Sequence, residues 1–192
     1  MSSRMPLPPE LVRPTKLYSS HEILSKDCPV PKSPGVYAWY FRNFLPFAVT
    51  ADCIQYDNLR LLYIGTAPST PVSKSNLRKR LKGHLRGNAS GSTLRLSLGC
   101  LLNEKLGIQL RRVGSTERKT FHDGEKALSE WIAQNAFVIW HVCPEPWKVE
   151  HALILALSLP LNLDKNRIHP FYQELSSARD SARKIALQLP VL

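Results

Sequence analysis

The sequence lacks the features that mark several common classes of protein. Its four cysteines, Cys28, Cys53, Cys100 and Cys143, include no pair at metal-knuckle spacing, which predicts reduced structural thiols and neither disulfides nor a zinc site. The longest apolar run, residues 152–163, is broken by polar residues and a proline and is too short to span a bilayer. The N-terminus has no apolar core of the kind found in signal peptides. We therefore expect a soluble cytoplasmic protein without membrane contacts.

Acidic residues are also scarce. The 192 residues include 15 Asp and Glu against 26 Lys and Arg, so the formal net charge is +11. This excess predicts an anionic partner, and nucleic acid is the most abundant candidate. Charge alone leaves open a solubilising positive surface, an acidic protein or an anionic lipid. With 43% hydrophobic residues, the chain is long and apolar enough for one domain with its own core.

Hydrophobic periodicity predicts an α+β domain with a small sheet, mixed or antiparallel, of three or slightly more strands. The first two strands, at residues 35–41 and 59–64, are expected to pair antiparallel, and a third is expected at 137–142. Strict alternation in the second strand would place Leu59, Leu61 and Tyr63 on one face. Helices are expected at residues 21–26, 74–87, 94–105, 123–135 and 170–189 and from Pro146 to just before Pro160, with one or two short strands within 106–121.

Three parts of the chain are distinguished by their composition. Residues 1–30 predict an extended N-terminal arm that carries a short helix, in which Ser19 and Glu22 have the form of a capping box. Residues 31–168 hold the expected sheet and form the main domain. Residues 169–192 predict a basic C-terminal helix packed on that domain.

The helix expected at residues 74–87 carries basic side chains beside an apolar stripe. At about 100° per residue, Arg80 and His84 fall against this stripe, whereas the other basic side chains point to solvent. One interpretation is that Arg80 runs along the edge of the core and His84 is a satisfied boundary histidine. The other is that both residues meet the sheet at a functional site. The stripe consists of Leu77, Leu81 and Leu85, and the solvent side of Lys79, Lys82 and Arg86.

Glu150 stands in the middle of the apolar face of the helix that begins at Pro146. Its neighbours on this face are Trp147, Leu153 and Ile154. Because an unpaired buried charge is costly, the carboxylate must be paired, protonated or bound to a cation. An internal salt bridge to an arginine and a metal-binding or catalytic role both remain open.

These residues form an ordered set along the chain. Gly35-Val36-Tyr37 and Tyr63-Ile64-Gly65 are followed by Arg80, then by Glu150, then by Asn162. In this order the chain resembles the GIY-YIG nuclease superfamily over about residues 33–166, with Val36 in place of the family's isoleucine. Each triplet alone is a weak signal, and the order of all five elements makes the combination specific.

The resemblance implies a metal-dependent endonuclease that hydrolyses phosphodiester bonds with a single divalent cation, Mg²⁺ or Mn²⁺. Its substrate would be nucleic acid, with DNA favoured over RNA. Specificity would have to come from the loops at residues 67–76 and 86–92 and from the basic C-terminal helix near Arg179 and Arg183. The loops are small, polar and basic and suit phosphate contacts, which position a strand without reading its sequence. We therefore expect a weakly specific or structure-directed nuclease, and a compact restriction enzyme acting as a homodimer is a further option. The alternatives are a catalytically silent nucleic-acid-binding module with the same fold and an interaction protein with a basic surface.

The resemblance also implies a role for each matching residue. Glu150 would bind the metal, and Arg80 would hold the scissile phosphate and stabilise its developing charge. Tyr37 and Tyr63 would position and deprotonate the attacking water. His84 stands where relatives carry a histidine or a tyrosine near the attacking group. Asn162 would be a structural or phosphate-contacting support, and further contacts to nucleic acid are expected from Lys74, Arg78, Lys82 and Arg86.

Two departures from the family pattern affect this assignment. The loop before Arg80 is longer than in compact members, so Arg78 is an alternative, although the helical wheel favours Arg80. Several relatives carry a lysine three residues after the second tyrosine, where this chain has Thr66. Lys74 is one substitute for that lysine, and the sequence does not decide which tyrosine is the base.

Overall fold

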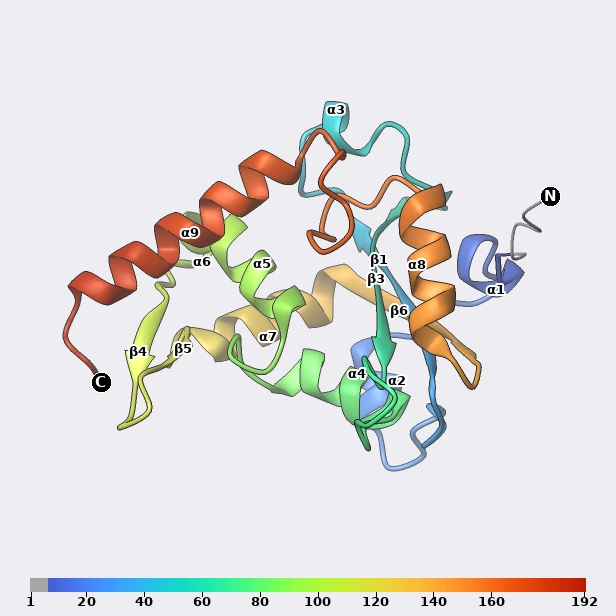
Figure 1. Ribbon diagram of the computed structural model, residues 1–192, viewed down its shortest axis with the longest axis horizontal. Helices are drawn as coiled ribbons and strands as arrows, with labels where there is room; N and C mark the ends of the chain where they lie inside the picture. Colours follow the sequence, from blue (N-terminus) through green and yellow to red (C-terminus); the bar gives the residue numbers. More distant parts are fainter. Residues whose placement is uncertain (1–6) are drawn as a thin grey trace.

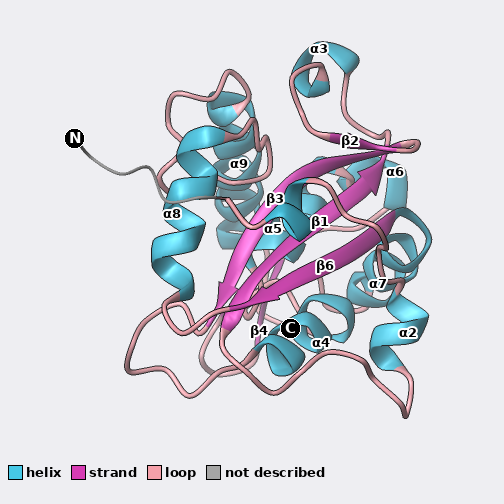
Figure 2. Cartoon of the chain, turned by 90° about the vertical axis from the view of Figure 1, so that its right-hand side faces the viewer, coloured by secondary structure: helices cyan, strands magenta, loops and turns pink. Residues whose placement is uncertain are grey.

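A four-stranded antiparallel sheet lies at the centre of the computed structural model, which describes residues 7–192 (Figures 1 and 2). The strand order is β2-β3-β1-β6, so β1 pairs on one side with β3 and on the other with β6. The predicted α+β class is therefore confirmed, and of the two sheet types expected, the antiparallel one is found. The strands are β1 (Gly35–Arg42), β2 (Gln55–Tyr56), β3 (Leu59–Ala67) and β6 (Ala136–Val142), and a separate hairpin pairs β4 (Arg111–Val113) with β5 (Arg118–Thr120).

Helices cover both faces of the sheet because β1 is apolar on both faces. Tyr37 and Trp39 of β1 belong to one buried cluster, whereas Val36 and Tyr40 belong to the other. α1 and α8 lie on the second face, and α4, α5 and α7 lie on the first (Figure 1). The helices are α1 (Pro9–Val12), α2 (Ser20–Leu24), α3 (Phe47–Thr50), α4 (Leu77–Arg86), α5 (Thr93–Leu101), α6 (Asn103–Leu106), α7 (Gly124–Asn135), α8 (Pro146–Ala156) and α9 (Tyr172–Gln188).

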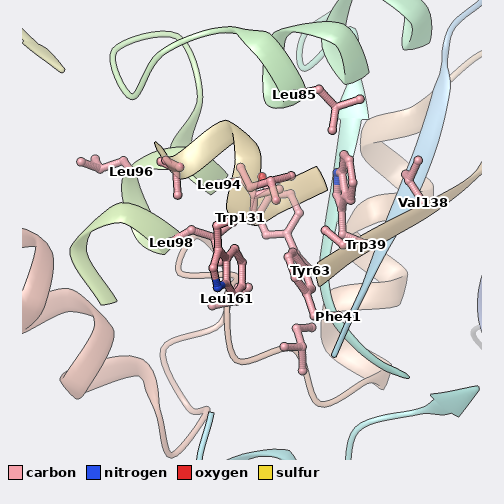
Figure 3. Close-up of a cluster of buried hydrophobic side chains, with 14 of the residues drawn as sticks. Trp39, Phe41, Tyr63, Leu85, Leu94, Leu96, Leu98, Trp131, Val138 and Leu161 are labelled. Carbon is pink, nitrogen blue, oxygen red and sulfur yellow. The ribbon is translucent and has the colours of Figure 1, made fainter. Parts of the chain in front are cut away.

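The larger of the two clusters is built from aromatic strand residues and leucine-rich helices. Figure 3 shows Trp39 and Tyr63 from the strands beside Leu94 and Leu98 of α5 and Trp131 of α7. Each such side chain contributes roughly 1.5–3 kcal/mol when fully buried. This packing fixes α4 and α5 against the sheet, and both helices carry residues of the site described below.

Local sequence signals set several helix starts. Ser19 and Glu22 form the predicted capping box of α2. Asn76 caps α4 and Ser92 caps α5 through side-chain acceptors, and the single helix expected at 94–105 is divided into α5 and α6. Asp123 occupies the N-cap position of α7, although its side chain makes no capping hydrogen bond within the described residues.

A β-bulge in β3 changes which side chains share a face. The pairing register with β1 shifts after Trp39, and Leu62 has no partner residue on β1. Tyr63 consequently packs in the cluster of Trp39, whereas Leu59 and Leu61 pack on the opposite face. The predicted common face for Leu59, Leu61 and Tyr63 is therefore wrong, because an inserted residue interrupts the strict alternation.

The outer edge of β3 is covered mainly by a loop. β2 pairs only with the first two residues of β3. Further along, the Leu161 amide donates to the Leu62 carbonyl at 3.0 Å. The Asn162 side chain accepts from the Ile64 amide at 2.9 Å and donates to its carbonyl at 2.8 Å. The loop after α8 thereby occupies polar backbone groups that an open sheet edge would leave unpaired.

The N-terminal segment is tied to the sheet where it is described. Tyr18 forms an isolated antiparallel bridge with Val138 of β6, and α1 packs on β6. The first six residues of the predicted arm lie outside the described residues. Within residues 7–192, no helix has the length and apolar character needed to cross a membrane.

Candidate active site

A cavity of about 560 Å³ lies beside β3, where residues from both sides of the sheet meet. Four of the predicted catalytic residues line it: Tyr37 of β1, Tyr63 of β3, Arg80 of α4 and Glu150 of α8. Asn162 lines it as well, with its amide engaged on β3. The fifth predicted catalytic residue, His84, does not line the cavity and lies behind Tyr37.

The glycines of the two triplets have a steric role. Tyr37 and Gly65 are directly opposed in the β1–β3 register. A Cβ atom on Gly65 would collide with the Tyr37 phenol, and one on Gly35 would collide with the His141 carbonyl and Leu77. Glycine at both positions therefore lets the Tyr37 ring cross β3 and lets β1 approach its neighbours closely.

Tyr37, His84 and Ser92 form a chain of short hydrogen bonds. The Tyr37 hydroxyl lies 2.7 Å from His84 Nε2, and His84 Nδ1 lies 2.7 Å from the Ser92 Oγ. His84 is fully buried, and burial together with the Arg80 charge lowers its pKa well below 6.5. A neutral ring carries one N–H. The chain is satisfied when Nδ1–H donates to Ser92 and Nε2 accepts from Tyr37.

Arg80 presents a guanidinium group that is only partly used by the protein. Its Nε donates to the Tyr37 hydroxyl at 3.3 Å, and its Nη1 donates to the Gly91 carbonyl at 2.9 Å. Within residues 7–192, Nη2 has no hydrogen-bond partner and Arg80 forms no ion pair. Burial acts to lower the pKa of Arg80, but the Tyr37 and Tyr63 phenols outweigh it, so the pKa is raised and the group stays charged. It is suited to bind an anion in the cavity.

Both tyrosines are neutral phenols in this environment. Burial raises the pKa of Tyr37 and of Tyr63, and the charge of Arg80 opposes this rise at each. The Tyr63 hydroxyl lies 3.3 Å from the Thr93 Oγ, and either oxygen can donate. Neither tyrosine is therefore a ready base, and a phenol that takes a proton must pass its own proton on.

Glu150 carries a carboxylate that the protein compensates weakly. Its side chain is 19% exposed, and its nearest cation is Lys165, whose Nζ lies 3.4 Å from the Oε2. Burial raises the pKa of Glu150, Lys165 opposes this rise, and Asp164 adds to it. Of the two interpretations left open by the sequence, the salt bridge to an arginine is not found among residues 7–192, where the partner is an exposed lysine that lines the cavity.

This donor set fits a hard divalent cation. Residues 7–192 contain no cluster of three or more His, Cys, Asp or Glu side chains arranged to hold a metal. Mg²⁺ commonly binds through one or two carboxylates and completes its shell with water and substrate phosphate oxygens. Glu150, with Asp164 in the same cavity, supplies such carboxylates.

The remaining predicted phosphate contacts are not at the cavity. Lys74, Lys82 and Arg86 do not line it, and neither does Arg78. Arg78 donates to the Val30 carbonyl at 2.6 Å and to the Cys28 carbonyl at 3.4 Å, which ties the N-terminal segment to α4. Their contact with nucleic acid stays a prediction, and the wheel argument for Arg80 over Arg78 agrees with the geometry.

Sequence reasoning missed several residues that build this site. Arg95 is fully buried, and its Nη1 donates to the His84 carbonyl at 3.0 Å, so it supports the last turn of α4. A charged residue among the leucines that follow the Ser92 cap was the available signal. Lys165 lines the cavity, and no local sequence pattern marks it. Arg179 also lines the cavity, and it belongs to the basic C-terminal helix that the sequence predicts.

The comparisons with known proteins give one finding. A family model described as the GIY-YIG catalytic domain matches residues 35–181, from the first residue of β1 into α9. No curated protein and no solved structure gives a significant match.

Proposed function

The chain belongs to the GIY-YIG family, whose members are generally endonucleases that use a divalent metal, and we propose that it hydrolyses phosphodiester bonds of DNA with Mg²⁺ or Mn²⁺. One observation carries the proposal. Tyr37, Arg80 and Glu150 come from three separate elements and converge on one cavity, and two of them carry charges that the protein leaves partly unsatisfied.

Charge stabilisation would come first from Arg80. Hydrolysis of a phosphodiester places extra negative charge on the phosphate oxygens as the water oxygen bonds to phosphorus and the ester bond breaks. Arg80 is held by Tyr37 and Gly91, so its free Nη2 is oriented before the substrate arrives. A divalent cation bound at Glu150 would add Lewis-acid stabilisation of the phosphate and of the leaving oxygen.

Tyr37 is the better candidate for the base. Its hydroxyl can accept a proton from water while it passes its own proton to His84 Nε2, 2.7 Å away. Among the described residues, the hydrogen-bond acceptor found for the Tyr63 hydroxyl is the Thr93 hydroxyl, which is a poor proton acceptor. In this scheme Tyr63 orients the water, and Ser92 holds the His84 ring in the accepting tautomer through Nδ1.

The decisive experiment incubates the protein with plasmid DNA, single-stranded DNA and RNA, with Mg²⁺, with Mn²⁺ and with a chelator. We expect metal-dependent cutting of DNA and a loss of about 10²-fold or more in Glu150→Gln, because the cation then loses its carboxylate. Glu145→Gln is the matched control, since this glutamate also belongs to the start of α8 but is 52% exposed and pairs with Lys148.

Two outcomes would contradict the proposal. Equal cutting by the wild type and by Glu150→Gln would remove Glu150 from the mechanism. Salt-dependent binding of nucleic acid without any cutting would identify a catalytically silent module with the same fold.

A further inference from the structure

α9 forms a basic wall of the cavity, and its side chains have no part in the proposed chemistry. Ser176, Arg179 and Arg183 of α9 all line it, and their spacing places them on one face of the helix. α9 packs against α5 (Figure 1). Thr93 and Ser97 of α5 line the cavity beside them.

Arg179 is the unsatisfied member of this wall. Its Nε is buried without a hydrogen-bond partner, and within the described part of the chain the residue forms no ion pair. Burial lowers the pKa of Arg179, as does the neighbouring Arg183, yet a guanidinium stays charged at neutral pH. Arg183, by contrast, pairs with Asp180 at 3.0 Å on an exposed surface. A buried donor without an acceptor is costly, which suggests that its acceptor arrives with a ligand.

The charges around the cavity indicate what that ligand carries. Among residues 7–192, the cations Arg80, Lys165, Arg179 and Arg183 line the cavity, but only two carboxylates do, Glu150 and Asp164. Arg80 and Glu150 account for one phosphate and its metal. Within the described residues, Arg179 is then left without an anion, although it lies within electrostatic range of Tyr63 at the same site.

We propose that Arg179, assisted by Arg183 and Ser176, binds a phosphate of the substrate strand that neighbours the scissile phosphate. The inference rests on the proposed function and narrows its substrate to a polynucleotide with consecutive phosphates. The contact positions the strand by its backbone and reads no base. It holds the strand in the bound and transition states alike, so its loss raises KM and leaves kcat unchanged.

The test uses a fluorescein-labelled DNA duplex and wild-type protein in chelator, so that binding is measured without cutting. Arg179→Gln is expected to weaken binding about tenfold, the effect of one charged hydrogen bond. The slope of log affinity against log salt should fall by about 0.7–0.9, the value for one phosphate contact. Lys184→Gln, an exposed charge on the same helix that does not line the cavity, is the matched control.

A second arm locates the phosphate. Neutral methylphosphonates are placed singly at positions around the cut site. In wild type, one position next to the scissile phosphate should weaken binding about tenfold, and Arg179→Gln should be insensitive at that position alone. If Arg179→Gln loses cooperative unfolding, Arg179→Lys carries the same test, because it keeps the charge but loses the guanidinium fork.

The outcomes separate this inference from the proposed function. Wild type that cuts DNA, with identical methylphosphonate profiles for wild type and the Arg179 variant, would overturn the subsite alone. An effect of Lys184→Gln as large as that of Arg179→Gln would also overturn it, by showing a general charge effect. Wild type that neither binds nor cuts nucleic acid would overturn both.

Discussion

Two regions of this protein bury charged groups, and they differ in how completely those groups are paired. Around Arg95, which is fully buried, the guanidinium donates to the Glu125 carboxylate at 2.6 and 3.0 Å and to the Ser129 hydroxyl at 3.0 Å. Glu125 in turn accepts the Ala89 amide at 2.7 Å. In the cavity, and within residues 7–192, Arg80 keeps a free Nη2 and Glu150 has only a lysine at 3.4 Å.

The difference separates structural charges from chemical ones. A closed network of hydrogen bonds offsets the cost of burial and leaves no group available to a ligand. Charged groups that are incompletely paired keep part of the cost of burial, and a substrate or a cation that pairs with them offsets it. The two regions are connected, because the His84 carbonyl accepts from Arg95 while its ring contacts Tyr37.

The largest effect is expected from removal of Arg80, the arginine whose guanidinium is only partly paired. Arg80→Ala should lower the cutting rate by about 10²–10³-fold, because the charge that develops on the phosphate loses a preorganised donor. The melting temperature should change little, since Arg80 forms no ion pair in the described chain. Single-turnover cleavage and thermal unfolding measure the two effects.

Lys79→Ala is the control for Arg80→Ala, because it removes a neighbouring exposed charge of the same helix. Arg80→Lys should also cut poorly, since an ammonium group lacks the guanidinium fork. A wild-type cleavage rate in Arg80→Ala would place Arg80 among the structural charges.

Removal of Arg95, whose guanidinium is fully paired, should instead lower the stability of the fold. Arg95→Met leaves the Glu125 carboxylate without its cation, so the free energy of unfolding should fall by about 3–5 kcal/mol. For a chain of this size the melting temperature should drop by roughly 6–20 °C. Calorimetry or circular dichroism measures the loss, and Arg95→Met combined with Glu125→Leu should recover part of it. An unchanged melting temperature would show that the network is dispensable.

The smallest expected effect concerns His84, which lies between the two regions. Its pKa is lowered in the folded protein, so the unfolded chain takes up a proton that the folded chain does not. The contribution of His84 to stability is therefore fully present above pH 6.5 and decreases as the pH falls below it, with a slope of at most about 1.4 kcal/mol per pH unit.

Denaturant titrations of the wild type and of His84→Gln, from about pH 7 to about pH 5, measure this slope. The difference between the two proteins removes the contribution of other groups such as His169, whose pKa burial also lowers. The stability gap between the two proteins should narrow as the pH falls. Parallel curves would mean that His84 has the same pKa in the folded and unfolded states.

Much of the fold was predictable because its signals are local. β1, α4 and α9 lie close to their expected ranges, and the Ser19 capping box is formed. The bulge at Leu62 was not predictable, because it depends on how β3 pairs with a strand distant in the sequence. The closure of the β3 edge by Asn162 is likewise a pairing between distant residues, which no local pattern encodes.

The sequence by itself determined the parts of the site: two glycine–tyrosine triplets in strands, Arg80 beside an apolar stripe, and Glu150 inside an apolar face. Periodicity decides which face of a helix or strand a side chain shares, and this is enough to mark a charge that will be buried. Only the tertiary structure decided which buried charges are fully paired, as at Arg95, and which are left partly unpaired within the described residues, as at Arg80 and Arg179. The reason is physical, because pairing depends on distances of a few ångströms between elements that are brought together only by packing.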